Sequence, residues 1–131
     1  MKSVNKTAKK VLEILTADLK RPGDHKRIDN SAGSFMAVSV EQIGWCGDDP
    51  VFSVAHYYEQ NGDLMRDPEM IFLRRAGEYY PVYFRQDGLP FEERSVFYDN
   101  EGVIRYYPRL QKDHARFANT WMRNIKDQQG L

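Results

Sequence analysis

Five side chains around one predicted β-hairpin have the types that acid–base chemistry or a metal ion requires. Asn61-Gly62 is the strongest hairpin signal in the sequence, since both residues tolerate positive φ. With these two residues as the loop, His56 faces Asp67 across the strands, and Glu69 lies diagonal to His56 on the same face. The candidate binding cluster is therefore His56, Tyr58, Asp63, Asp67 and Glu69.

This cluster has two interpretations. An imidazole held by a carboxylate can act as a general base, and a histidine beside two or three carboxylates can weakly hold a divalent metal. Alternatively, His56 and Asp67 form a cross-strand hydrogen bond that only fixes the strand register, and a bulge at Asp67-Pro68 would disrupt even this pairing. We favour the structural interpretation, and we assign no catalytic residue, no metal ligand and no cofactor.

Other chemistry-bearing residues give weaker signals. The spaced motifs of nucleotide-binding proteins, serine hydrolases and zinc proteases are absent from the sequence. Cys46 is the single cysteine, which excludes an intramolecular disulfide and a zinc site built on several cysteines. His114 falls on an apolar helical stripe, where a buried core histidine is the expected role. These observations favour a binding protein over an enzyme.

The elements that position these residues follow from hydrophobic periodicity. Residues 1–20 form an N-terminal helix, because apolar residues recur at helical spacing at Ala8, Val11, Leu12, Leu15 and Leu19. The period changes to two from Phe35 onward, which predicts an antiparallel sheet over residues 35–107. Residues 108–127 form a C-terminal helix with His114, Phe117, Trp121 and Ile125 on its inward stripe.

Short turns between strands impose antiparallel pairing, so the sheet is a meander of five to six strands. The two amphipathic helices must cover one of its faces. The predicted fold is an α+β two-layer sandwich that forms a single domain over residues 1–131. We expect residues 24–34 to be a loop, residues 87–90 to be a turn, and Pro81 to occupy an edge strand or a bulge.

Charge is balanced overall but is unevenly distributed. The chain has 19 Lys and Arg and 19 Asp and Glu, and its pI is about 6.8, which argues against a strongly basic nucleic-acid binder. Residues 1–27 nevertheless carry a charge of +5, and the remainder carries −5. A solvated face is the simpler explanation. The alternative is a basic contact surface for phosphate, formed by Lys6, Lys9, Lys10 and Arg21.

The predicted strands are rich in tyrosine and arginine, and the helices leave one sheet face uncovered. Such a face, with Arg66, Arg85 and Arg105, suits a protein interface or base stacking. The expected partner is a protein or a nucleic acid, and the sequence leaves the oligomeric state open. No apolar run is long enough to cross a membrane, and we expect a cytoplasmic protein.

Three segments carry a resemblance to a known family: HYYEQNGDLMRDPEM (56–70), YYPVYFRQDG (79–88) and LQKDHARFANTWMRNI (110–125). They resemble a family of small bacterial domains of unknown function, often encoded on plasmids and on integrative and mobile elements. The resemblance implies an accessory protein of a mobile element, and it brings no activity or catalytic residue. The leading hypothesis is a non-enzymatic interaction module that uses the Tyr/Arg-rich sheet face. The alternative is a small hydrolase or metal-dependent enzyme built on His56, Asp67 and Glu69.

Overall fold

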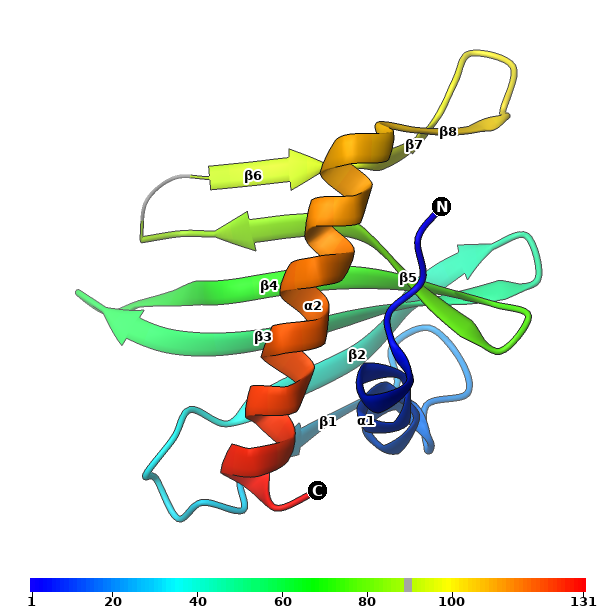
Figure 1. Cartoon of the computed structure of the whole chain (residues 1–131). Helices are drawn as coiled ribbons and strands as arrows, with labels where there is room; N and C mark the ends of the chain where they lie inside the picture. The colour runs from blue at the N-terminus through cyan, green and yellow to red at the C-terminus, as the bar shows by residue number, and fades with distance from the viewer. Residues whose placement is uncertain (89–90) are drawn as a thin grey trace.

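The computed structural model describes residues 1–88 and 91–131, which form an α+β two-layer sandwich as predicted. The six strands of the main sheet lie in chain order, every neighbouring pair is antiparallel, and both helices cover one face (Figure 1). The elements are α1 (Lys6–Thr16), β1 (His25–Ile28), β2 (Val38–Cys46), β3 (Asp49–Gln60), β4 (Asp63–Arg75), β5 (Glu78–Gln86), β6 (Phe91–Arg94), β7 (Val96–Tyr98), β8 (Ile104–Tyr106) and α2 (Pro108–Gln129).

Two tight turns with left-handed residues set the register of the central strands. Asn61 and Gly62 join β3 to β4 with φ values of 52° and 84°, which confirms the predicted two-residue hairpin. Ala76 and Gly77 join β4 to β5 in the same way, with φ values of 52° and 78°. The turn expected at residues 87–90 lies partly outside the described residues.

Bulges change the register in the middle of the sheet. One shifts the β3–β4 pairing between Ala55 and Tyr57, opposite the Asp67–Pro68 peptide. Another lies between β4 and β5 at Pro81, which pairs with Phe72 in an interior strand. Of the two placements expected for Pro81, the bulge is therefore the correct one.

The helix layer closes the main core. The Asn5 side chain accepts a hydrogen bond from the backbone N–H of Ala8 at 2.9 Å and so begins α1, which is shorter than the predicted 1–20. Gly130 ends α2 in the left-handed conformation, with φ of 66°. Large side chains buried between the sheet and the helices include Leu12, Leu15, Phe52, Met70, Phe72, Tyr79, Met122 and Ile125.

The inward stripe of α2 is only partly as predicted. Trp121 is 5% exposed and belongs to the main core, as expected. Phe117 is 42% exposed, so the prediction that it points inward was wrong. The buried stripe is centred between Trp121 and Met122, which leaves Phe117 on its flank, with its ring edge against Phe84 at a centroid distance of 5.1 Å.

Two strand assignments also differ from the prediction. Residues 24–34 contain β1, a four-residue edge strand whose sequence, HKRI, lacks the apolar alternation that would have indicated it. Residues 91–98, part of the predicted meander, do not form one strand but are divided at Ser95, whose N–H donates to the Val82 carbonyl at 3.0 Å and whose carbonyl accepts from the Tyr107 N–H at 2.9 Å. Strand β7 then leaves the main sheet and pairs with β8.

The N-terminal segment is tied to α2 by side-chain amides. The backbone N–H of Lys2 donates to Gln111 Oε1 at 2.6 Å, and Gln111 Nε2 donates back to the Lys2 carbonyl at 2.8 Å. The backbone N–H of Asn5 donates to Asn119 Oδ1 at 2.8 Å. Residues more than 100 positions apart are thereby held together in the helix layer.

Candidate functional site

His56 and Glu69 lie on opposite faces of the sheet, so the predicted cluster is not assembled. The expected pairing holds near the loop, as far as Tyr57 opposite Arg66, and it shifts by one residue beyond the bulge, where Glu69 pairs with Ala55. A one-residue shift moves a side chain to the other face of a strand. The prediction that His56 and Glu69 share a face was therefore wrong.

His56 belongs to the core between β3 and α2. Its ring is buried and meets the Trp121 ring edge to face, with the centroids 5.4 Å apart and the planes at 88°. Burial lowers the pKa of His56 below its usual value, and the charge of Asp67 opposes this shift only in part. No protein group among the described residues bonds its Nε2. This environment is that of a neutral core histidine.

The other predicted members of the cluster are dispersed. Asp67 Oδ1 accepts a hydrogen bond from Gln86 Nε2 at 2.7 Å, and Asp63 is exposed beside the hairpin loop. Tyr58 directs its hydroxyl toward Gly88. In the described parts of the chain, no three His, Cys, Asp or Glu side chains are placed to hold a metal ion. The geometry that the hydrolase and metal hypotheses require is not formed.

Glu69 instead joins a charged network on the uncovered face of the sheet. Its carboxylate accepts from Ser53 Oγ at 2.6 Å and lies 3.3 Å from Arg66 Nε. Asp87 accepts from the Arg66 backbone N–H at 2.9 Å and from Arg85 Nε at 2.7 Å. Arg66 and Arg85, two of the three arginines expected on this face, are therefore neutralised by carboxylates.

A second polar cluster, formed by Ser95, His114 and Glu93, lies under α2. His114 Nδ1 is 2.9 Å from Ser95 Oγ, and its Nε2 is 3.1 Å from Glu93 Oε1. Serine, histidine and a carboxylate resemble a catalytic triad by type, but Ser95 is 0% exposed and no substrate reaches it. Through this cluster, His114 of α2 contacts Glu93 in β6 and Ser95, the residue between β6 and β7. Periodicity indicated a buried His114, but nothing in the sequence indicated its partners.

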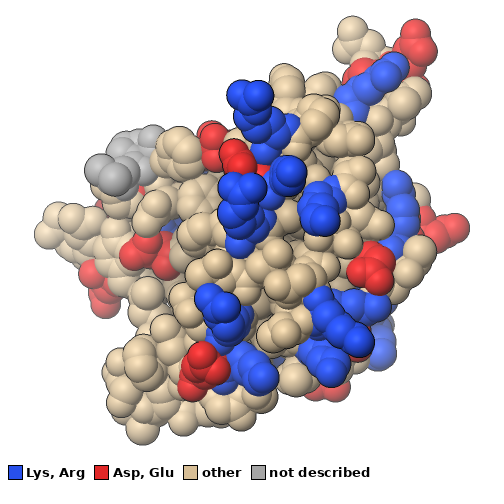
Figure 2. Space-filling model, viewed as in Figure 1, with Lys and Arg blue, Asp and Glu red and all other residues tan. Residues whose placement is uncertain are grey.

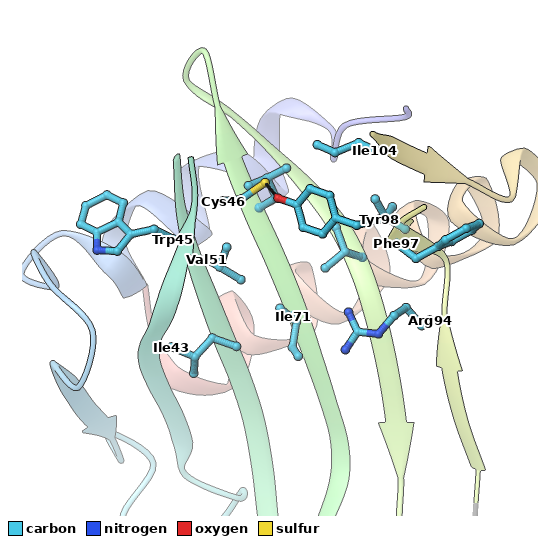
Figure 3. Close-up of a pocket in the computed structure, with 12 residues that line it drawn as sticks. Ile43, Trp45, Cys46, Val51, Ile71, Arg94, Phe97, Tyr98 and Ile104 are labelled. Carbon is cyan, nitrogen blue, oxygen red and sulfur yellow. Dashed lines mark hydrogen bonds between the residues drawn. The ribbon is translucent and has the colours of Figure 1, made fainter. Parts of the chain in front are cut away.

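An apolar hollow of about 200 Å³ lies between the uncovered sheet face and the β7–β8 hairpin (Figure 3). Val51 and Ile71 form part of its floor, and Phe97 and Ile104 line it from the hairpin. We call this feature the hairpin hollow. Its lining is Ile43, Trp45, Cys46, Val51, Ile71, Leu73, Val82, Arg94, Val96, Phe97, Tyr98 and Ile104.

Aromatic side chains at the rim of the hairpin hollow are unusually exposed. Trp45 is 51% exposed and Tyr98 is 56% exposed, and the Tyr98 hydroxyl contacts Cys46 Sγ. Among the described residues that line the hollow, Arg94 is the one with a charged side chain, and its guanidinium lies 5.0 Å from the centre of the Tyr83 ring. The hollow therefore presents apolar and aromatic groups beside the Arg94 guanidinium, and Arg75, which is paired with Asp49, lies at the rim with its Nη2 3.8 Å from Cys46 Sγ.

Sequence reasoning missed the hairpin hollow, although the strands contained a signal for it. Val51, Ile71 and Leu73 alternate with the residues that face the helices, so β3 and β4 are apolar on both faces. A strand that is apolar on both faces indicates that both are covered at least in part. The location of the hollow also depends on the change at Ser95 from β6, in the main sheet, to β7, in the β7–β8 hairpin, which the sequence did not predict.

The predicted basic contact surface is only partly free. Lys6 and Lys10 are exposed on α1, whereas Lys9 pairs with Glu78 at 3.0 Å and Arg21 lies 3.8 Å from Asp24. The helix side of the molecule carries further basic side chains from α2, so blue groups dominate the view in Figure 2. The basic surface thus extends well beyond the residues identified from the first helix.

The fold and these sites define a small two-layer α+β domain with an apolar surface hollow. A family model described as "Domain of unknown function (DUF6908)" matches residues 6–131, and the chain belongs to this family. None of the curated proteins and none of the solved structures compared with the chain matches it. Among the described residues, no helix is long and apolar enough to cross a membrane.

Proposed function

We propose that this domain is a non-enzymatic binding module that holds an apolar segment of another protein in the hairpin hollow. The observation that carries the proposal is the exposure of Trp45 and Tyr98 at the rim of an apolar depression. Large aromatic residues that remain exposed around such a depression are typical anchors of protein interfaces.

The size of the hollow favours side chains of a protein over a small-molecule cofactor. Cavities that enclose drug-sized ligands measure roughly 300–1,000 Å³. The hairpin hollow, at about 200 Å³, is smaller and open to solvent, so it has room for one or two apolar side chains. Arg94 at its wall favours a carboxylate next to those side chains, which gives the partner segment an apolar–acidic character.

The charge of this side of the molecule favours a protein over a nucleic acid. Residues 25–106, which contain all the strands, have 14 Asp and Glu against 8 Lys and Arg. Arg66 and Arg85 are occupied by Glu69 and Asp87, and Arg105 lies 2.9 Å from Asp99. A phosphate backbone would meet a net negative surface here.

The proposed setting is an accessory role on a bacterial mobile element, in the cytoplasm. It is supported by the resemblance of the segments 56–70, 79–88 and 110–125 to domains encoded on such elements. A module without catalytic residues fits this role by bringing a partner protein into an assembly.

Selection from a phage-displayed peptide library tests the proposal directly. We expect enriched peptides to share one or two bulky apolar residues beside Asp or Glu, and to bind the domain measurably by calorimetry. Trp45→Ala and Tyr98→Ala should each weaken this binding at least tenfold, because each removes a rim anchor. Phe35→Ala is the matched control, since Phe35 is exposed to a similar extent and does not line the hollow.

Three results would contradict the proposal. Selected peptides could bind the Trp45 and Tyr98 variants as well as the parent. The library could yield no binder. Sedimentation could reveal a dimer that Tyr98→Ala dissociates, which would assign the hollow to a second copy of this chain.

A further inference from the structure

We propose that the helix layer is a second, independent interaction surface, which binds the phosphate backbone of a nucleic acid. The proposal concerns the face opposite the hairpin hollow and goes beyond the binding function proposed above. It rests on how charge, helix geometry and ion pairing are distributed between the two layers of the fold.

Charge is separated by layer rather than only by position in the sequence. Residues 1–24 and 107–131, which contain both helices, have 11 Lys and Arg against 5 Asp and Glu. The helix-bearing segments therefore carry +6, and the strand-bearing residues 25–106 carry −6. A neutral chain thus has one strongly basic face, which its overall charge conceals.

The cations of α2 lie on one side of the helix. Arg109, Lys112, Arg116 and Arg123 fall within an arc of about 60° at 3.6 residues per turn, and they extend along about 21 Å of the axis. All four are exposed. Because they stand on a helix packed against the sheet, their backbone positions are fixed before any ligand binds.

Most of these cations have no acidic partner. Among the described residues, an acidic group lies within salt-bridge distance of Arg116, whose Nη1 is 3.6 Å from Asp113, but not of Arg109, Lys112 or Arg123. Four further lysines are exposed and have no acidic partner among the described residues: Lys2, Lys6, Lys10 and Lys126. These charges are available to an external anion.

Geometry favours a nucleic acid over an anionic membrane. Helices that bind a membrane surface insert an apolar face into it. The apolar stripes of α1 and α2 are already buried against the sheet, and the large apolar side chains exposed on the two helices are Ile14 and Phe117. A duplex presents one negative charge per about 1.7 Å of its axis, which matches a row of cations on a rigid helix.

Fluorescence anisotropy with a labelled 24-base-pair duplex of random sequence tests the proposal. We expect binding at 50 mM salt, and an affinity that falls with a slope of about −4 in log K against log salt, as four or more displaced counterions require. The double variant Lys112→Glu/Arg123→Glu should weaken binding at least tenfold. Both positions are exposed, so circular dichroism should show an unchanged fold.

A matched charge change on the sheet layer tests whether binding depends on the helix layer itself or only on the net charge of the protein. Arg27→Glu/Arg105→Glu alters net charge by the same amount at two exposed residues, and it should leave the affinity within threefold of the parent. Tyr98→Ala should also leave it unchanged, which distinguishes this proposal from the one for the hairpin hollow. Equal losses in both double variants, no binding at 50 mM salt, or binding only to vesicles containing anionic lipid would overturn it.

Discussion

The rings of His56 in β3 and Trp121 in α2 meet edge to face in the seam between the sheet and the longer helix. Both side chains are buried, and within the described residues neither His56 Nε2 nor Trp121 Nε1 has a protein hydrogen-bond partner. The seam is therefore held by packing and aromatic contact at this point. Its stability should be sensitive both to the loss of ring volume and to the protonation of His56.

Replacing the indole ring of Trp121 should strongly destabilise the domain. Trp121→Ala leaves a cavity under α2, and removing a buried aromatic side chain costs about 3–5 kcal/mol, a large part of the total stability of a domain. For a chain of this size, the melting temperature should fall by roughly 10 °C or more. Trp45→Ala, at a half-exposed rim position, is the control and should change it little. A Trp121→Ala protein that melts within 2 °C of the parent would show that α2 is not docked as described.

Acid should destabilise the domain through His56. The folded state lowers the pKa of His56 below the value of 6.5 that applies when the chain is unfolded, so the unfolded state binds the proton more readily. This contribution to stability is complete above pH 6.5 and is lost as the pH falls below it. In urea titrations between pH 7.5 and 5, His56→Gln should reduce the pH dependence of the unfolding free energy. His25→Gln, at an exposed position, should retain it, and identical slopes in both variants would refute the assignment.

The β3–β4 hairpin should depend on glycine at position 62. With φ of 84°, Gly62 occupies a backbone region that costs a residue with a Cβ about 1–2 kcal/mol, so Gly62→Ala should destabilise the domain by that amount. Gly44→Ala adds the same methyl group where φ is not left-handed and no atom lies within 4 Å. Denaturant titration should place Gly44→Ala within 0.5 kcal/mol of the parent, as is usual at such sites. Equal effects at the two positions would argue against the two-residue turn.

The charge of Asp87 should stabilise the uncovered sheet face. Hydrogen bonds from the Arg66 backbone and from Arg85 lower the pKa of Asp87, so its contribution is present above pH 3.8 and decreases below it. Asp87→Asn keeps the shape but removes the charge, and should cost about 1–2 kcal/mol near pH 7. Asp127→Asn, on the exposed face of α2, is the control. An Asp87→Asn protein as stable as the control at pH 7 would show that the network contributes nothing measurable.

Periodicity and turn chemistry predicted most of the fold. The Asn61-Gly62 hairpin, the bulge at Pro81 and the burial of Trp121 all follow from local rules about φ, missing N–H groups and helical spacing. Strand β1 was not predicted because three polar residues and the single apolar Ile28 show no alternation of apolar and polar side chains. The division at Ser95 was missed because the backbone changes partner there, from the Val82 carbonyl of β5 to the N–H of Tyr107, and no local pattern records these contacts.

The candidate site was much less predictable. The assignment of His56 and Glu69 to one face required an uninterrupted register, and a single bulge opposite Asp67-Pro68 reversed it. The separation of charge between the helix layer and the sheet layer was not predicted for a related reason. The first helix was recognisably basic, but the contribution of Arg109, Lys112 and Arg123 becomes apparent only when α2 is placed beside α1 on the same face.

Because Lys2 bonds to Gln111 and Asn5 bonds to Asn119, the N-terminal segment cannot complete its contacts during translation until α2 has been synthesised. A ribosome adding about 5–20 residues per second needs about 2–9 s to proceed from the end of β5 at Gln86 to the end of α2 at Gln129. Throughout that interval the nascent chain has all the central strands but lacks the helix that covers them. Slow codons between positions 87 and 129 would prolong the exposure of this apolar sheet, so the yield of native protein should depend on the decoding speed of that stretch.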